Sequence, residues 1–208
     1  MPWPKEHKHN TRARIIEAAA AAFRQRGIAD VSVGNVMREA GLTHGGFYAH
    51  FASKDDLLAA AVAFASSQVT EIVDSKAATD GPMPPLLRAA FAYLSTAHFS
   101  HPEWGCPIAT LGPDLIRSGP KVRRTFAAGI KERLEQLYEL APPGMPVETR
   151  KREVAGVLAC MIGGLILARG LRESDGLEFL KDCQGFLKDA LSSPTVAKSK
   201  NEAPVDSE

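Results

Sequence analysis

The sequence predicts an all-α protein, and three observations support this. Apolar residues recur at helical spacing, as at Ile15, Ala19 and Phe23 on one face of residues 11–27. Ser, Thr, Gly and Pro stand where such stretches begin and end. Runs that alternate apolar and polar residues, which would indicate strands, are absent. The chain has 208 residues, 45% hydrophobic and 24% charged, so a soluble globular protein with a sizeable core is expected.

Four capped helices are expected in the first third of the chain. Side-chain oxygens of Ser, Thr and Asn satisfy free N–H groups at helix starts, and glycine adopts the left-handed conformation that often ends a helix. The sequence Ser-Lys-Asp-Asp at 53–56 resembles a capping box. The expected helices cover residues 11–27 (cap Asn10 or Thr11, ending at Gly27), 33–40 (cap Ser32, ending at Gly41), 44–51 (cap Thr43) and 54–74 (cap Ser53).

The remaining two thirds are also expected to be helical. Residues 75–85, SKAATDGPMPP, form a linker punctuated by Gly and Pro, and we place a boundary near it. The longest uncharged apolar run, 154–168, has 15 residues and is shorter than the roughly 20 needed to span a bilayer. The expected elements are helices at 86–99, 121–141, 148–171 and 175–191, a short helix with turns within 101–120, and a disordered polar tail at 192–208.

Charge is distributed unevenly along the chain, although the net charge is only +1. Residues 1–55 hold eight Lys and Arg against five Asp and Glu, a balance of +3. The other 153 residues hold 17 and 19, a balance of −2. Four of the six histidines also fall in the first 50 residues. The mildly basic N-terminal quarter indicates an anionic partner for that end.

The three cysteines, Cys106, Cys160 and Cys183, are far apart and show no metal-ligand spacing. We therefore expect no disulfide framework, no metal site, no cofactor and a reduced cytoplasmic setting. The N-terminal residues MPWPKEHKHN contain no apolar segment of the kind found in signal peptides. Cys160 and Cys183 lie on apolar helix faces and are interpreted as inert.

The stretch GLTHGGFYAHF, residues 41–51, places Gly45 and Gly46 where the flanking pattern is helical. Glycine costs about 1 kcal/mol relative to alanine in a helix. Two short helices joined by a tight Gly-containing turn after a longer helix are typical of a helix-turn-helix unit, whose second helix enters the DNA major groove. Glycines there would allow close approach to DNA. The alternative is that they only end a helix or form a loop.

Residues 30–57, DVSVGNVMREAGLTHGGFYAHFASKDDL, closely resemble the DNA-binding signature of the TetR family of bacterial repressors. With the preceding helix ending in FRQRG, the resemblance covers about residues 10–60. It implies a three-helix helix-turn-helix DNA-binding domain at residues 1–55 and a larger helical ligand-binding and dimerisation domain at 56–191. Beyond residue 60 the chain matches the family in helix count and length only.

The resemblance implies a role in DNA contact for residues that match the family motif. Thr43 would bond to a phosphate or base edge, Tyr48 would contact the backbone or a thymine methyl, and Lys54 would bind phosphate. His44 stands where Lys or Arg is usual, which weakens the expected phosphate or guanine contact. Phe47 is interpreted as core, like Phe51. The DNA-contact residues are Arg12, Arg14, Ser32, Val33, Thr43, His44, Gly45, Gly46, Tyr48, His50 and Lys54.

The resemblance also implies a small-molecule pocket and a homodimer. Small residues such as Ala155, Gly156 and Ala159 would let helix 148–171 pair with a second copy in a four-helix bundle, although this helix would also suit the centre of a monomeric core. The apolar pocket candidates indicate a hydrophobic or aromatic ligand. They are Phe64, Phe91, Leu94, His98, Trp104, Cys106, Ile108, Leu111, Phe126, Ile130 and Met161.

The expected function is therefore a cytoplasmic, ligand-responsive transcriptional regulator with double-stranded DNA and a small-molecule effector as partners and no membrane role. It would act as a repressor that binds a palindromic operator as a homodimer and is released by a small hydrophobic ligand. One alternative is an electrophile- or redox-sensing repressor using Cys106, which precedes a helix start where thiolate is favoured, and another is a packing role for Cys106.

Two other classes are disfavoured. An enzyme using Cys106, or His98 and His101 with Glu103 and Asp114, would need a nucleophile elbow, a phosphate loop or metal spacing, and the sequence has none. A sequence-independent DNA binder would rest on many phosphate contacts, and a balance of +3 is small for that role.

Overall fold

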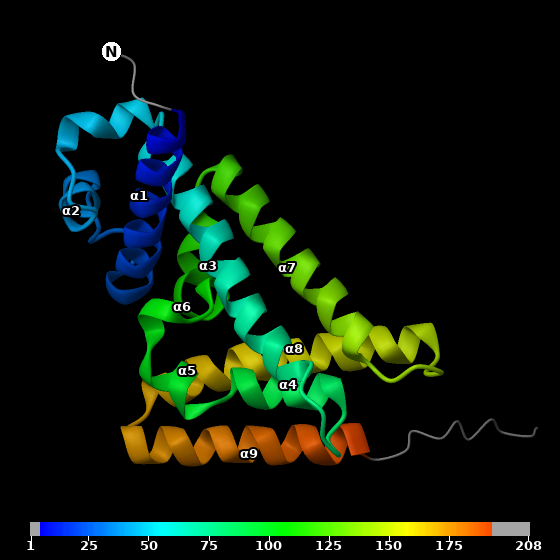
Figure 1. The fold of residues 1–208 in the computed structure, drawn as a ribbon. Coiled ribbons are helices and arrows are strands. Elements are labelled where there is room, and N and C mark those ends of the chain that lie inside the picture. The colour runs from blue at the N-terminus through cyan, green and yellow to red at the C-terminus, as the bar shows by residue number, and fades with distance from the viewer. Residues whose placement is uncertain (1–4, 193–208) are drawn as a thin grey trace, which may run out of the picture.

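The computed structural model describes residues 5–192, which form nine α-helices and two short 3₁₀-helices without any strand (Figure 1). The all-α prediction is confirmed for this part of the chain. The predicted tail from residue 193 lies outside it. The elements are α1 Lys5–Arg26, α2 Val33–Glu39, η1 His44–Ala49, α3 Lys54–Ala77, α4 Pro85–Tyr93, α5 Thr96–Ser100, η2 Pro102–Trp104, α6 Pro107–Arg117, α7 Pro120–Leu140, α8 Val147–Gly170 and α9 Glu173–Ser192.

Several of the predicted helix caps are confirmed. The Ser32 hydroxyl accepts a hydrogen bond from the Asn35 N–H at 3.1 Å and caps α2. Ser53 caps α3 in the same way through the Asp56 N–H at 3.1 Å. Gly27 has a φ of +83°, the left-handed conformation expected where α1 ends.

The starts of two N-terminal elements differ from the prediction. α1 begins at Lys5 rather than after a cap at Asn10 or Thr11, because KEHKHN continues the helix and Thr11 is buried in it. The helix predicted over residues 44–51 is a 3₁₀-helix, η1, that ends at Ala49, and the Thr43 hydroxyl makes no capping hydrogen bond. The Gly45-Gly46 pair weakens the α-helical preference at this point.

Three expectations in the C-terminal part also need correction. The helix expected over 86–99 is divided into α4 and α5, because Ser95 starts a new helix with its hydroxyl accepting from the His98 N–H. α3 continues to Ala77, three residues into the predicted linker. Within 101–120, the short helix with turns consists of η2 and the longer α6, which accommodates Pro113.

Two clusters of buried side chains share α3. The first joins the start of α3, for example Leu57 and Val62, to α1, α2 and η1, and also takes in Leu111 and Phe126 from α6 and α7. The second joins the later part of α3 to α4, α7, α8 and α9. The first cluster therefore extends beyond the predicted boundary at residue 55.

The elements are arranged along α3 and α7, which pack against each other (Figure 1). α1, α2 and η1 lie at one end, and α8 and α9 lie side by side at the other. By length and composition alone, α3 and α8 are each long and apolar enough to cross a membrane, although the uncharged run within α8 has only 15 residues. Both helices place their buried side chains in the two clusters.

The close approach of α8 and α9 predicts a cost for a methyl group at Gly176. A Cβ there would stand 2.4 Å from the Ala168 carbonyl oxygen, so Gly176→Ala should lower the free energy of unfolding by about 1–3 kcal/mol. Gly112→Ala in α6 meets nothing within 4 Å and should raise it by up to about 1 kcal/mol. Urea denaturation at fixed protein concentration measures both. Equal stability of the two variants would contradict this packing.

Candidate functional site

The predicted DNA-contact residues of η1 lie on an exposed surface. Thr43, His44 and Gly45 are exposed, and Tyr48 is 70% exposed although it is aromatic. The Tyr48 ring is held edge-on to the buried Phe47 at a centroid distance of 5.2 Å. The face is thus rigidly attached to the core while its polar and aromatic groups point outward.

Side-chain packing in the protein interior does not require glycine at either position of η1. A Cβ at Gly45 would meet nothing within 4 Å, and one at Gly46 would make only an ordinary contact with Met37 at 3.6 Å. Neither has a positive φ. Glycine at position 45 therefore leaves space on the outside of the molecule, as the sequence analysis expected for a surface approached by another molecule.

Three predicted cationic contacts also serve the fold. Arg14 Nη2 donates to the Ala40 carbonyl at 2.7 Å, beside the end of α2. Lys54 Nζ donates to the Ile28 carbonyl at 2.7 Å, just past the end of α1. The guanidinium of Arg12 lies over the Phe51 ring, 4.8 Å from its centroid. Cations near helix C-termini are favourable, so these contacts hold the side chains in place.

His50 lies in a basic surrounding that the sequence analysis did not identify. Its Nδ1 is buried and makes no hydrogen bond. Burial, with smaller effects from Lys8, Arg12 and His7, lowers the pKa of His50. Ser32 is exposed and Val33 is half-buried against the first cluster at the start of α2. This end of the molecule brings imidazole, guanidinium and ammonium groups together beside η1.

A cavity of about 170 Å³ lies between α3 and α7. Val69, Ile108 and Leu158 form apolar parts of its wall. Tyr93 and Cys106 also line it, although both side chains are almost completely buried. The exposed wall of the cavity is mainly apolar, and hydroxyl, amide and charged side chains such as Thr70, Glu132 and Gln136 stand among the apolar ones, a combination that suits a small-molecule site.

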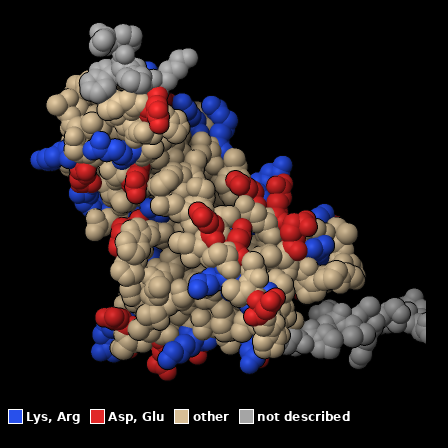
Figure 2. All heavy atoms as spheres, viewed as in Figure 1, with Lys and Arg blue, Asp and Glu red and all other residues tan. Residues whose placement is uncertain are grey.

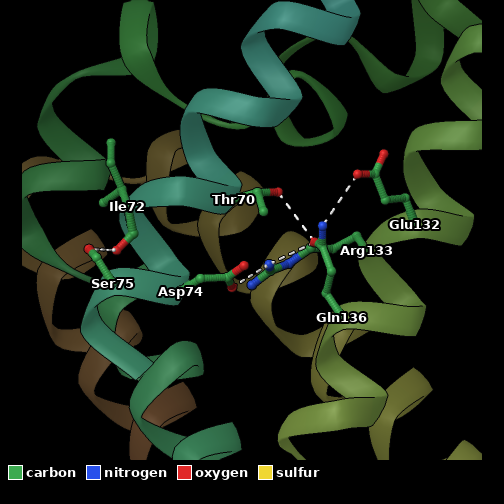
Figure 3. A network of polar contacts seen from close by, with 7 residues as sticks. All are labelled: Thr70, Ile72, Asp74, Ser75, Glu132, Arg133 and Gln136. Atoms are coloured by element: carbon green, nitrogen blue, oxygen red, sulfur yellow. Dashed lines mark hydrogen bonds and ion pairs between the residues drawn. The ribbon is translucent and has the colours of Figure 1, made fainter. Parts of the chain in front are cut away.

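A polar network crosses from α3 to α7 at this cavity (Figure 3). Arg133 Nη1 donates to Asp74 Oδ1 at 3.1 Å and to Gln136 Oε1 at 3.2 Å. Thr70 Oγ1 reaches the same Gln136 oxygen at 3.4 Å, and Gln136 Nε2 donates to Glu132. Thr70 and Asp74 of α3 point toward Arg133 and Gln136 of α7 in Figure 3, whereas Ile72 and Ser75 lie away from this network. Arg133 itself is only 8% exposed.

The structure brings only part of the predicted pocket together. Cys106 and Ile108 line the α3–α7 cavity, while His98 and Trp104 line a separate hollow of about 290 Å³ beside Val69 and Ile72. The other candidates pack into the buried clusters or against them, because contacts between helices bury their apolar surface. These are Phe64, Leu111, Phe126 and Ile130 in the first cluster and Phe91, Leu94 and Met161 in the second.

Sequence reasoning did not select Tyr93 or Arg133, the buried polar residues of the cavity. One signal for Arg133 was present. Phe126, Ile130 and Leu137 repeat at i, i+4 and i+11 on the inner side of α7, and Arg133 occupies the i+7 position of the same stripe. A charged residue in an apolar stripe indicates a buried polar site.

The turn at Gly105–Cys106 joins this cavity to α1. Arg24, only 5% exposed, donates from Nη1 to the Gly105 carbonyl at 2.9 Å and from Nη2 to Gln68 Oε1 at 3.0 Å. The Cys106 N–H donates to His98 Nε2 at 2.9 Å. A Cβ at Gly105 would stand 3.1 Å from both His98 and Arg169, so the turn fits closely.

His98 is held as a neutral imidazole. Because Nε2 accepts from Cys106, Nδ1 carries the proton and donates to the Tyr93 carbonyl at 2.7 Å. Burial lowers the pKa of His98 to about 4, and the nearby Arg169 and Arg24 act in the same direction. Arg169 also donates to the backbone carbonyls of His98 and Phe99.

The other two cysteines have thiols of low reactivity. Burial raises the pKa of Cys160 to about 11, and burial also raises the pKa of Cys183. Both thiols are therefore protonated at neutral pH, in agreement with their interpretation as inert.

Charged side chains differ between the two ends of the face shown in Figure 2. Lys and Arg are spread around the N-terminal end with Asp and Glu among them. Several Asp and Glu side chains lie over the middle of the molecule, where α3 and α7 run, and others lie at the end formed by α8 and α9.

Comparison with known proteins places this geometry in a wider group. Residues 15–61 match the family model for bacterial regulatory proteins of the tetR family. The chain is 32% identical over 174 residues to the uncharacterized HTH-type transcriptional regulator YdgC of Bacillus subtilis (strain 168), covering 83% of this chain and 84% of that protein.

Two further similarities concern part of the sequence or the fold. The HTH-type transcriptional regulator TtgR of Pseudomonas putida is 45% identical over 56 residues, which is 27% of each chain. The crystal structure of a TetR transcriptional regulator from Chloroflexus aurantiacus J-10-FL superposes with a TM-score of 0.74 at 24% identity, covering 90% of this chain and 97% of that one. The similarity to the Chloroflexus aurantiacus structure shows a shared fold only.

The neutral His98 predicts a specific pH dependence of stability. The unfolded chain takes up a proton at His98 near the ordinary pKa of 6.5, whereas the folded protein does so only at about 4. The contribution of neutral His98 is therefore complete above pH 6.5 and is lost as the pH falls to 4, at most about 3 kcal/mol. His98→Gln should show a flatter stability profile in urea denaturation between these pH values. Parallel profiles of the two proteins would contradict the assignment.

Proposed function

Because the chain belongs to the tetR family of bacterial regulatory proteins and is a helix-turn-helix transcriptional regulator, we propose that it represses transcription as a homodimer. Each copy places η1 in the major groove at one half of a palindromic operator. A small molecule bound in the α3–α7 cavity releases the protein. The observation that carries this proposal is the exposed face of η1, where Gly45 leaves open space beside Thr43 and Tyr48.

The DNA contacts divide into those that position the protein and those that read bases. Arg12, Arg14, His50 and Lys54, with the N-terminal end of α2 at Ser32 and Val33, surround η1 and suit phosphates. Thr43, His44 and Tyr48 are on η1 itself and would reach base edges or thymine methyl groups. Most of these contacts would thus fix the position of the protein along the DNA. His44 in place of a longer cation limits the reach toward guanine.

The dimer would form through α8 and α9. One face of α8 packs into the second cluster, with Val157, Met161 and Leu165 buried. The opposite face exposes Ala155, Gly156, Ala159, Ile166 and Leu167. On α9, Gly185 and Phe186 are exposed, and Phe186 is 65% accessible. Small residues flanked by apolar ones allow close helix approach, which supports an intersubunit four-helix bundle.

Release would pass through the Gly105–Cys106 turn and α3. A molecule in the cavity touches Cys106 and Ile108, next to the carbonyl that holds Arg24 of α1. It also touches Ser66 and Thr70 of α3, the helix that begins directly after the DNA-binding element. A ligand that prefers a different arrangement of this turn would shift the population toward dimers whose recognition elements no longer match successive major grooves.

This role requires double-stranded DNA and takes place in the cytoplasm. The relatives are named as transcriptional regulators, which supports a non-enzymatic role. In the part of the chain that the structure describes, no three His, Cys, Asp or Glu side chains are grouped so that they could hold a metal ion.

DNA recognition is tested by adding a side chain at Gly45. Gly45→Leu should fold normally, because the space is open, but it should block close approach of η1 to DNA. Binding to the operator would then fall toward the non-specific level, on the order of 1,000-fold. DNase footprinting on DNA upstream of the gene, at fixed salt, identifies the site, and titration gives the affinity. Gly81→Leu, which also meets open space, is the matched control.

Undiminished operator binding by Gly45→Leu would exclude η1 as the recognition element. The same experiment with Tyr48→Ala should weaken binding by about 10-fold, since a single aromatic contact is lost.

The dimer interface is tested by a charge on the exposed face of α8. Ala159→Glu should convert the dimer to a monomer at micromolar concentration, because a buried unpaired carboxylate opposes the α8–α8 approach. Multi-angle light scattering after size exclusion measures the mass. Ala127→Glu, on the exposed side of α7, should leave the mass unchanged. A monomeric parent protein, or an Ala159→Glu protein that remains dimeric, would argue against this interface.

A further inference from the structure

Two residues that line the α3–α7 cavity carry buried hydrogen-bond donors without a strong partner, and the Tyr93 hydroxyl has only the weakly accepting Cys106 thiol beside it. The hydroxyl of Tyr93, a residue only 2% exposed, makes no hydrogen bond of normal geometry. Arg133 is 8% exposed, and its Nη2 also has no partner although Nη1 has two. Both residues line the cavity. Buried donors of this kind cost free energy unless a partner satisfies them, so the cavity is suited to a molecule that supplies an acceptor.

Both groups remain donors at neutral pH. Burial raises the pKa of Tyr93 well above its ordinary value, with the Cys106 thiol acting in the same direction and Arg169 and Arg133 opposing it. The Tyr93 hydroxyl thus keeps its proton. A guanidinium has no acceptor site at all. Arg133 therefore requires an acceptor, and the Tyr93 O–H also needs an acceptor for its proton, while the Tyr93 oxygen is itself able to accept.

The charge of Arg133 is already balanced. Its Nη1 is 3.1 Å from the Asp74 carboxylate, and Glu132 lines the same cavity. Figure 3 shows Asp74 on one side of Arg133 and Glu132 on the other. A ligand carboxylate would add a third negative charge to one cation. An uncharged acceptor satisfies the donors without this repulsion.

The size of the cavity limits the ligand to about one ring. A cavity of about 150 Å³ is known to hold benzene, and this one has about 170 Å³. Val69, Ile108 and Leu158 would contact the apolar body. The remaining space corresponds to a short substituent that carries the acceptor.

We infer that the cavity binds an uncharged, single-ring or similarly small apolar molecule whose carbonyl oxygen accepts hydrogen bonds from Tyr93 and Arg133. This rests on the proposed function in treating such a molecule as the effector. It narrows the expected hydrophobic or aromatic ligand to one with a neutral acceptor, and it gives Tyr93 and Arg133 the role of selecting it.

The experiment compares three probes of similar size by isothermal titration calorimetry without DNA. Acetophenone carries a carbonyl, ethylbenzene lacks an acceptor, and benzoate carries a charge. Tyr93→Phe removes only the hydroxyl and should weaken acetophenone binding by about 5-fold, and Arg133→Met by about 10-fold. Neither should weaken ethylbenzene binding. Tyr138→Phe, a matched change outside the cavity, should affect no probe.

The charge argument has its own test. Benzoate should bind more weakly than acetophenone to the parent protein. Asp74→Asn should strengthen benzoate binding while leaving acetophenone binding nearly unchanged. Folding of Tyr93→Phe is checked by urea denaturation, where it should be at least as stable as the parent because an unsatisfied hydroxyl is removed.

Equal effects of Tyr93→Phe on acetophenone and ethylbenzene, or tighter binding of benzoate than of acetophenone, would overturn the inference. Its failure is separable from that of the proposed function. Operator binding without Tyr93-dependent acetophenone binding removes only the ligand assignment. Tyr93-dependent acetophenone binding in a protein with no specific DNA site removes the proposed function and leaves the ligand chemistry standing.

Discussion

The guanidinium of Arg24 is buried between α1, α3 and the Gly105–Cys106 turn. Its hydrogen bonds tie α1, at the N-terminal end of the molecule, to α3 and to this turn. Burial lowers its pKa to about 10, yet it stays charged and bonds to the Ala20 carbonyl, the Gly105 carbonyl and Gln68. Removing a cation from water costs several kcal/mol unless hydrogen bonds compensate. These three acceptors come from three separate parts of the chain, so the bonds persist only while α1, α3 and the turn keep their positions. A change at the turn is therefore felt directly by α1.

The polar groups of the α3–α7 cavity have the opposite character. Each nitrogen of Arg24 makes a hydrogen bond, whereas the Tyr93 hydroxyl and one nitrogen of Arg133 do not. Such unsatisfied donors lower the stability of the empty protein, and a ligand that satisfies them recovers that free energy. The cavity wall includes Cys106, one residue from the carbonyl that holds Arg24. The hydrogen bonds that a ligand would gain in the cavity and the hydrogen bond that holds Arg24 are thus joined by two adjacent residues, Cys106 and Gly105. This proximity gives the proposed regulation a short physical path.

In the proposed DNA complex, the cations of the N-terminal end would serve both the fold and the contact with phosphate. Arg14 and Lys54 bond to carbonyls near the ends of α2 and α1, and Arg12 covers the Phe51 ring. These contacts hold the three helices together and orient the same charges beside η1. Since a phosphate would compete with neutral carbonyls rather than with carboxylates, the cost of exchanging partners on DNA is small. In the proposed complex, a net balance of +3 over residues 1–55 would suffice for positioning, and recognition would rest on the exposed face of η1.

The sequence by itself determined which segments are helical, where Ser32 and Ser53 cap them, and that the Gly45-Gly46 stretch lies on a helix-turn-helix surface. These features depend on residues close together in the chain, through periodicity, capping and glycine conformation. It did not determine the cavity. Phe126 and Leu111 were predicted to line the pocket, but both are buried in the first cluster. Trp104 was also predicted to line it and is 60% exposed. Tyr93, Cys106 and Arg133 come from different elements, and only the packing of α4, α6 and α7 around α3 decided that they share one space. Local sequence fixes what each helix can bury, but which side chains meet depends on distances across the fold.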